Sequence, residues 1–310
     1  MKRSLFYIKD SFWIIFLVVV LSSCVGRGEN STILPHVDTL GSSSPIPNTP
    51  VPPSPPQPSS TPAPLAARVN GKEITLAEFH TELALYKAAK GTDLAPEDEK
   101  RVLDNLIEET ILAQAAVEKG FVVDDVILDE HLKRLIGKTG EEKTLNEWMA
   151  AYGYEKGTLE TALSRSIGAA WMRDQIIETV PKNTEQVHAR QILLYNSDQA
   201  NEVLAQLDAG NDFGNLAKKF DPITGGDLGW FPRNYLPDPG IEEIAFELQP
   251  DEYSPVIQTI AGLHIIQVLE RDPQKPLSPD ALLTLQTKAL EDWLEAHVDE
   301  SVIEILYTSP

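Results

Sequence analysis

The sequence is poor in the residues that cross-link a chain or hold a metal or phosphate group. Among its 310 residues there is a single cysteine, which excludes an internal disulfide framework and leaves that cysteine to be explained otherwise. Basic residues are also scarce, since 26 Lys and Arg stand against 47 Asp and Glu, for a formal net charge of -21. Because so acidic a chain repels phosphate backbones, we expect no nucleic-acid partner. Its helical region shows neither clustered His and Cys at metal-ligand spacing nor a glycine-rich phosphate loop, and we expect no metal and no cofactor.

The N-terminus has no apolar run long enough to span a bilayer comfortably, because Phe12–Leu21 is only about ten residues long. A basic stretch precedes this run, and Leu21-Ser22-Ser23-Cys24 follows it. The tetrapeptide resembles the bacterial lipobox, in which the cysteine receives the lipid. We therefore expect a signal peptide over 1–23, lipidation of Cys24, and a chain exported to the outer face of the cell membrane, at the cell surface or in the periplasm. An uncleaved anchor helix with an incidental cysteine is the alternative.

Residues 24–65 cannot build a core, since the stretch from Ser42 to Pro64 consists almost entirely of Ser, Pro and Thr. Such a composition favours extended polyproline conformation, at about 3.1 Å per residue. We interpret the segment as a tether that holds the folded body away from the membrane. A ligand for proline-binding modules is the alternative interpretation.

The folded chain begins with an all-helical region over about 66–184. Two short extended pieces surround the Asn70-Gly71 turn, and Thr75 then caps a helix, with Glu78 placed to complete a capping box. Apolar residues at spacings of three and four predict four further helices, over about 96–119, 125–136, 145–152 and 156–180.

A different pattern follows over 185–271, where short strands and short helices predict a compact α+β domain with a small antiparallel sheet. The predicted strands cover 187–194, 253–259 and 264–269, and the predicted helices cover 198–209, 212–220 and 242–248. After Pro276 a long helix begins at the Ser278 cap. Its apolar stripe, with Leu285 and Trp293, needs a partner, so we expect residues 277–305 to complete the helical domain.

Three segments of the α+β domain match a known family in order and spacing. They are Ala189–Leu193, Gly225–Phe231 and Gly262–Ile266. Together they resemble the opening strand, central loop and closing strand of a parvulin-type peptidyl-prolyl cis-trans isomerase domain. The flanking regions are similar to the chaperone domain of SurA- and PrsA-type foldases. The resemblance implies a four-stranded antiparallel sheet surrounded by helices, beside a helical SurA-like chaperone domain.

The resemblance also implies a site. The socket for the proline ring matches Leu228, Leu236 and, after one inserted residue, Ile241, while Phe231 and Phe246 are interpreted mainly as core residues beneath it. Of the family's two paired histidines, only the second is present, as His264, with Thr259 at the usual threonine position. Gln191 takes the place of the first histidine, and we expect it to hydrogen-bond to His264. The loop that usually carries a Cys or Asp is shortened, and Asp221 is the candidate there.

Two functions are compatible with these residues. The first is an extracytoplasmic foldase whose isomerase domain acts on unfolded or proline-containing exported polypeptides. The second is a chaperone whose isomerase fold only docks peptides, which the loss of the first histidine and the short loop favour. The sequence does not indicate an oligomeric state.

Overall fold

The computed structural model describes residues 63–139 and 142–308. The predicted signal peptide, Cys24 and nearly all of the predicted tether lie outside these residues. The described helices and strands all lie in one unit, Pro64–Pro310. Among the described helices, none is long and apolar enough to cross a membrane.

A three-stranded sheet joins the two ends of the folded chain. β1 (Leu65–Val69) lies between β2 (Lys72–Thr75) and β7 (Ile303–Ile305) and is antiparallel to both. The turn between β1 and β2 is the predicted Asn70-Gly71 pair, whose φ angles of 50° and 82° are those that a tight hairpin turn requires. The sequence pattern does not predict β7, because a three-residue strand has too few residues to show a periodicity.

Two helices of this region begin at predicted caps. The Thr75 hydroxyl accepts a hydrogen bond from the Glu78 N–H at the start of α2 (Leu76–Lys90). Likewise, the Ser278 hydroxyl accepts from the Ala281 N–H at the start of α10 (Pro279–Glu300). The other helices are α3 (Pro96–Glu118), α4 (Asp125–Thr139), α5 (Glu142–Tyr152) and α6 (Lys156–Ile177).

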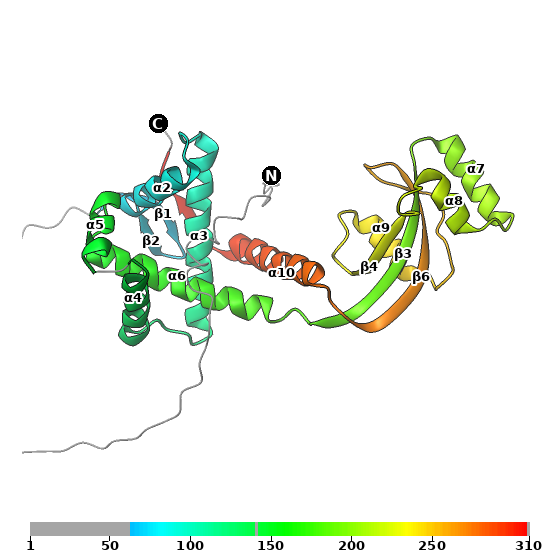
Figure 1. The fold of residues 1–310 in the computed structure, drawn as a ribbon. Coiled ribbons are helices and arrows are strands. Elements are labelled where there is room, and N and C mark those ends of the chain that lie inside the picture. The colour runs from blue at the N-terminus through cyan, green and yellow to red at the C-terminus, as the bar shows by residue number, and fades with distance from the viewer. Residues whose placement is uncertain (1–62, 140–141, 309–310) are drawn as a thin grey trace, which may run out of the picture. The chain divides into compact units, whose positions relative to one another are not determined.

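Part of the apolar stripe of α10 packs against α3 and α6 (Figure 1). Leu294 of α10 shares a core with residues of both helices, and Trp293 packs at its edge. The members from α3 and α6 are Leu112, Ala115, Ala116, Ala169, Met172 and Ile176. The last long helix of the chain therefore completes the core that the first helices begin.

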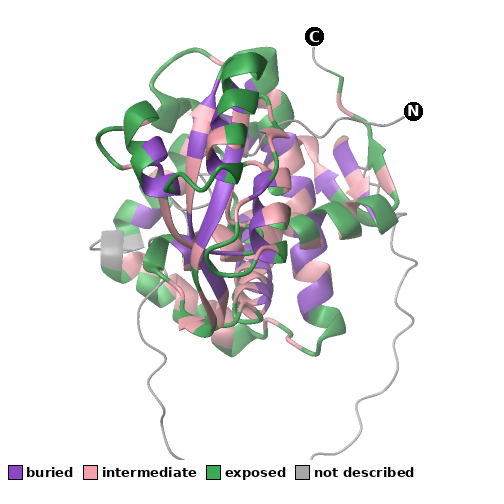
Figure 2. Cartoon of the chain, turned by 90° about the vertical axis from the view of Figure 1, so that its right-hand side faces the viewer, coloured by how far each residue is buried: buried purple, intermediate pink, exposed green. Residues whose placement is uncertain are grey.

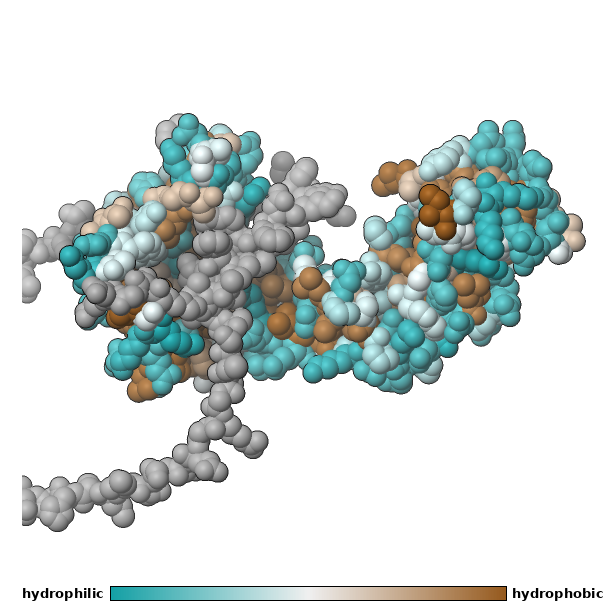
Figure 3. All heavy atoms as spheres, viewed as in Figure 1, coloured by the Kyte–Doolittle hydropathy of each residue, from teal (hydrophilic) through white to brown (hydrophobic). Residues whose placement is uncertain are grey.

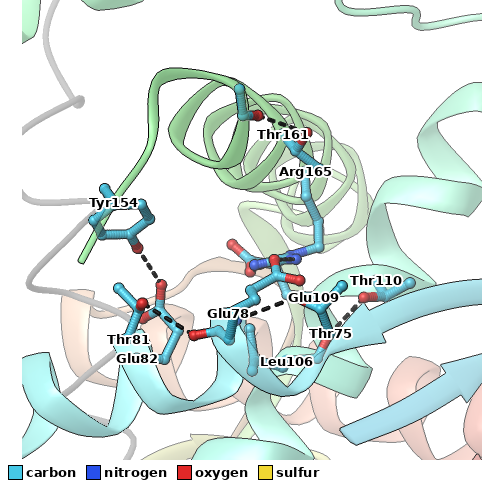
Figure 4. A network of polar contacts seen from close by, with 12 residues as sticks. Thr75, Glu78, Thr81, Glu82, Leu106, Glu109, Thr110, Tyr154, Thr161 and Arg165 are labelled. Atoms are coloured by element: carbon cyan, nitrogen blue, oxygen red, sulfur yellow. Dashed lines mark hydrogen bonds and ion pairs between the residues drawn. The ribbon is translucent and has the colours of Figure 1, made fainter. Parts of the chain in front are cut away.

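A buried polar network also connects these helices (Figure 4). Arg165 of α6, with only 12% of its side chain exposed, contacts Glu78 of α2 and, at 2.8 Å, Glu109 of α3. Burial disfavours the charged guanidinium, but the two carboxylates outweigh that cost and raise the pKa of Arg165. Nearby, burial raises the pKa of Glu82, which accepts a hydrogen bond of 2.7 Å from the Tyr154 hydroxyl. The predicted capping role of the Glu78 carboxylate thus gives way to an ion pair with Arg165.

The second sheet has four antiparallel strands in the order β4-β3-β6-β5, as the family resemblance predicts. Two long strands, β3 (Asn183–Leu194) and β6 (Leu263–Pro276), pair along their length at its centre (Figure 1). β4 (Asp227–Pro232) and β5 (Ile257–Gln258) form its edges. The prediction of a strand over 253–259 is wrong in length, because only β5 and a single bridge at Tyr253 pair with β6. Pro255, which lies between them, has no N–H to donate to the sheet.

Each face of this sheet is covered by helices. α7 (Ser197–Asp208) and α8 (Phe213–Phe220) pack on one face, over Ile192, Leu194 and Ile265. α9 (Pro239–Glu247) packs on the other face, over Val187, Ala189, Ile266 and Val268. Accordingly, Figure 2 shows the central strands buried over much of their length. The candidate site lies on the face that α9 covers only in part.

Candidate active site

Gln191 and His264 lie on the same face of the central strands. In the β3–β6 register His264 is opposite Leu193, and Gln191 is opposite Ile266, so these side chains all project from the α9 side. Gln191 Oε1 is 2.8 Å from His264 Nδ1. The hydrogen bond expected between the two residues is therefore present.

A directed chain of hydrogen bonds runs through the imidazole. The Ala261 N–H donates to Thr259 Oγ1 at 3.0 Å, and Thr259 Oγ1 is 2.9 Å from His264 Nε2. With Gln191 Oε1 facing Nδ1, the ring proton belongs on Nδ1, and Nε2 accepts from the threonine hydroxyl. Each hydrogen-bonding group in this series then has a partner while the imidazole is neutral, and hydrogen bonds at both ring nitrogens fix the orientation of the ring.

Burial keeps this imidazole neutral. His264 is 3% exposed, and burial lowers its pKa from the ordinary value, with the nearby carboxylate of Asp238 opposing that shift only in part. A glutamine partner cannot take up or release a proton in the neutral range. Gln191 and His264 therefore present fixed dipoles to a bound ligand, and the charge of the pair does not change in the neutral pH range.

An apolar wall lies on the same face of the sheet as the pair. Leu228 and Leu236 are partly buried and pack against the core between the sheet and α9. Phe231, Ile241 and Phe246 belong to that core itself, and the rings of Phe231 and Phe246 meet edge to face with centroids 6.2 Å apart. The two leucines are thus the members of the predicted set with accessible surface for a ligand, while the three buried residues support them from below.

Asp221 acts on the loop between α8 and β4. Its carboxylate accepts hydrogen bonds from the backbone N–H groups of Ile223 and Thr224, both at 3.1 Å, and from the Thr224 hydroxyl. These bonds lower the pKa of Asp221, with the Thr224 hydroxyl contributing most. The hydrogen bonds of Asp221 in this structure go to its own loop, and none reaches Gln191 or His264.

The sequence pattern does not single out Glu242, which the structure places under the apolar wall. This glutamate of α9 is only 7% exposed. Its carboxylate accepts backbone hydrogen bonds from Asn234, from Tyr235 at 2.9 Å and from Leu236 at 3.0 Å. An acidic residue in the first turn of a helix normally indicates only a favourable interaction with the helix dipole. No local sequence signal therefore reveals that Glu242 holds the loop that contains Leu236.

His188 does not replace the missing histidine. It lies three residues before Gln191 on β3, and its Nε2 is 2.9 Å from Asp227 Oδ1, while its ring stacks on Trp230. Its neighbours are therefore Asp227 and Trp230 of β4 and, at 3.9 Å, Glu270 of β6, and not His264. The separation agrees with the alternation of side chains along a strand.

Two family models match successive parts of this chain. The PPIC-type PPIASE domain family matches residues 177–270, and the SurA-like N-terminal domain family matches residues 54–173. The foldase protein PrsA of Clostridium botulinum is 25% identical over 293 residues, covering 74% of this chain and 85% of that protein. The chaperone SurA of Thiobacillus denitrificans is 26% identical over 252 residues, covering 67% of this chain and 56% of that protein.

Among solved structures, the peptidylprolyl isomerase PrsA from Bacillus cereus is similar at 19% identity with a TM-score of 0.43, covering 77% of this chain and 86% of that one. The two domain matches, together with the match to 85% of the Clostridium botulinum PrsA sequence, support one assignment. This chain carries a SurA-like N-terminal domain followed by a PPIC-type peptidyl-prolyl isomerase domain.

Proposed function

We propose that this protein is an extracytoplasmic foldase that speeds the cis–trans isomerisation of prolyl bonds in exported polypeptides. The observation that carries the proposal is the hydrogen-bonded His264 on the same face of the sheet as the proline socket, by which we mean Leu228, Leu236 and the supporting Ile241. The relatives named foldase protein PrsA and chaperone SurA support the same role.

The chemistry needs no covalent step. Rotation about a peptide bond meets a barrier of about 18–20 kcal/mol, whereas the two isomers before proline differ by only about 0.5–1 kcal/mol. A catalyst therefore has to bind the twisted amide better than either planar form. Twisting ends the resonance and localises the lone pair on the prolyl nitrogen, which favours a site with fixed polar groups and little water.

The described residues can divide this work between them. Leu228 and Leu236 would hold the proline ring by apolar contact. The residue before the proline would then rotate about the prolyl peptide bond while the ring stays in place. The chain from Thr259 through His264 to Gln191 would keep a fixed, neutral hydrogen-bonding surface beneath the amide. Because these dipoles are already oriented, little reorganisation would accompany the twist.

Replacing Leu236 tests the socket. Leu236→Ala should raise the KM for proline peptides several-fold, because it removes apolar contact worth about 1–2 kcal/mol. Leu283→Ala is the matched control, since Leu283 is exposed on α10. An unchanged KM in Leu236→Ala, measured with the full chain in lipid nanodiscs, would show that the socket is misplaced.

Anchoring and domain limits complete the proposal. We infer a signal peptide over 1–23, a lipidated Cys24 and a tether through residue 65. We also infer a helical domain over 66–184 that residues 277–305 complete, around an isomerase domain over 185–271.

Mass spectrometry of the membrane fraction should find the mature chain beginning at a lipidated Cys24, and Cys24→Ser should leave the chain unprocessed or in the soluble fraction. An unmodified Cys24 in the membrane fraction would contradict the anchor.

A second candidate is a chaperone module that binds proline-containing segments without isomerising them. Gln191 favours it, because an amide cannot change charge or tautomer as a second histidine could. The two candidates differ in one measurement. If peptides bind to the full chain but interconvert at the uncatalysed rate, the docking function stands and the enzyme does not.

A further inference from the structure

The loop between β4 and α9, which carries Leu236 of the proline socket, is held by two carboxylates. One is Glu242 of α9, which accepts the backbone N–H groups of Tyr235 and Leu236. The other is Asp280, in the first turn of α10, whose Oδ2 accepts a hydrogen bond of 2.6 Å from the Tyr235 hydroxyl. Tyr235 therefore connects the backbone next to Leu236 with a helix that lies outside the isomerase domain.

The helix α10 is fixed at both ends. Its Leu294 is buried in a core shared with α3 and α6. Just before its start, the buried Gln186 side chain of β3 donates hydrogen bonds to the carbonyls of Lys275 and Pro276, at 2.9 and 3.1 Å. Asp280 follows this fixed segment by only four residues, so its carboxylate is a defined point of attachment for the Tyr235 hydroxyl.

An open cavity of about 350 Å³ separates the neighbouring part of the loop from α10. Arg233 and Asn234 line it on the loop side, and Leu285 and Ala289 line it on the helix side. Figure 3 shows hydrophobic residues at the surface along this helix. In the described part of the chain, the bond from Tyr235 is the one side-chain hydrogen bond between residues 185–271 and α10. A single polar contact therefore connects the loop with this helix.

The Tyr235 hydroxyl remains a hydrogen-bond donor throughout the neutral pH range. Its bond to the Asp280 carboxylate raises the pKa of Tyr235, and burial adds to that shift. A hydrogen bond to a carboxylate is stronger than one between neutral groups. A second pair of the same kind joins the Tyr253 hydroxyl to Asp208 Oδ1 at 2.9 Å, on the opposite face of the sheet, where α7 packs.

We propose that Tyr235 and Asp280 are positioning residues through which α10 holds Leu236 in place for a proline peptide. This inference rests on the proposed function and adds a contribution of the helical domain to the isomerase site. Both residues act through Leu236, and the role requires neither to touch the peptide. A loop that is already ordered loses less conformational freedom when the peptide binds. Loss of the bond should therefore raise KM and leave kcat nearly unchanged.

Tyr235→Phe removes the hydroxyl and keeps the ring. In the full chain we expect it to raise both KM and Kd for a proline peptide about threefold to tenfold, as the loss of one hydrogen bond predicts. Exchange of the Leu236 amide should become faster, and kcat should stay within about twofold. Tyr253→Phe is the matched control and should change none of these quantities.

A double-mutant cycle tests the pair itself. Asp280→Ala should weaken peptide binding as Tyr235→Phe does, and the two substitutions together should have no larger effect than either one alone. Asp280→Asn should retain most of the affinity, because its amide oxygen can still accept from the hydroxyl.

The outcomes separate this role from the isomerase activity. If Tyr235→Phe leaves KM, Kd and Leu236 exchange unchanged, or weakens binding no more than Tyr253→Phe does, the positioning role is overturned and the proposed function stands. Additive effects of the Tyr235 and Asp280 substitutions also overturn it, since the two residues would then act separately. If the unmodified chain isomerises no peptide, the enzymatic function fails. Peptide affinity and Leu236 exchange then decide the positioning role, because neither requires turnover.

Discussion

Replacing Glu242 by glutamine tests how the proline socket is held in place. The buried carboxylate accepts backbone N–H groups through both oxygens, one from Asn234 and the others from Tyr235 and Leu236. An amide keeps only one accepting oxygen, so Glu242→Gln must turn an N–H₂ group toward at least one of these donors. The perturbation changes one atom and the charge while it preserves the volume of the side chain.

The magnitude follows from that geometry. In its better orientation the amide oxygen keeps the bonds to Tyr235 and Leu236 and loses the bond to Asn234. A hydrogen bond to a charged group is worth about 1.5–3 kcal/mol, and the two bonds that remain fall to about 1 kcal/mol each when the charge is removed. We therefore expect Glu242→Gln to destabilise the loop by roughly 2.5–7 kcal/mol. Asn234 has a positive φ of 63°, which asparagine tolerates better than most residues with a side chain, and its bond to Glu242 helps to hold it in this conformation.

The assay combines the affinity for a proline peptide with hydrogen exchange of the Tyr235 and Leu236 amides. Glu242→Gln should weaken peptide binding and speed exchange of both amides, because the loop that presents Leu236 loosens. The exposed neighbour Glu243 provides the matched control, and Glu243→Gln should change neither. If the two variants exchange at the same rates and bind peptide equally well, the carboxylate does not position the socket.

Three other predictions follow from the same contacts. Because burial lowers the pKa of His264, isomerase activity should stay within about twofold between about pH 6.5 and 8. The free energy of unfolding should fall as the pH drops below about 6.5, because there the unfolded state binds a proton at His264 before the folded state does. Gln191→His should leave peptide affinity unchanged but introduce a pH dependence near neutrality, seen in a pH–rate profile. Arg165→Leu should cost about 3–5 kcal/mol in urea unfolding, because it leaves buried carboxylates without their cation, whereas Lys288→Leu at an exposed pair should cost less than about 1 kcal/mol.

Each of these expectations has a result that contradicts it. A steep change of activity with pH in the unmodified chain would mean that His264 titrates in the neutral range. A pH–rate profile unaltered by Gln191→His would mean that the pair does not tune the site electrostatically. Equal unfolding free energies for the Arg165 and Lys288 variants would mean that the network of Figure 4 contributes little.

Local rules explain why much of the fold is predictable. Thr75 and Ser278 cap helices because a side-chain oxygen satisfies a free N–H within three residues, and Asn70-Gly71 turns because both residues tolerate positive φ. The pairing of Gln191 with His264 was also open to prediction, because the family motifs place both residues on neighbouring strands. In each case the partners are close in sequence or a known pattern connects them.

The contacts missed by the sequence lie between distant segments or among backbone groups. β7 forms only because α10 returns the chain to β1, and Glu78 pairs with Arg165 only after α2 and α6 have packed. Strand β5 is short because Pro255 interrupts the pairing that an alternating pattern predicts. Glu242 has no signal of its own, since its donors are backbone N–H groups, which every residue except proline possesses.

The amino-acid sequence by itself determined the element types, the helix caps, the family and the identity of the residues around His264. The tertiary structure alone decided what these residues do to one another. It directed Asp221 to its own loop, placed Glu242 beneath Leu236, and joined Tyr235 to Asp280 of α10. The physical reason is that propensity and periodicity act over a few residues, whereas burial and hydrogen-bond partnership depend on segments that meet only when the chain has folded.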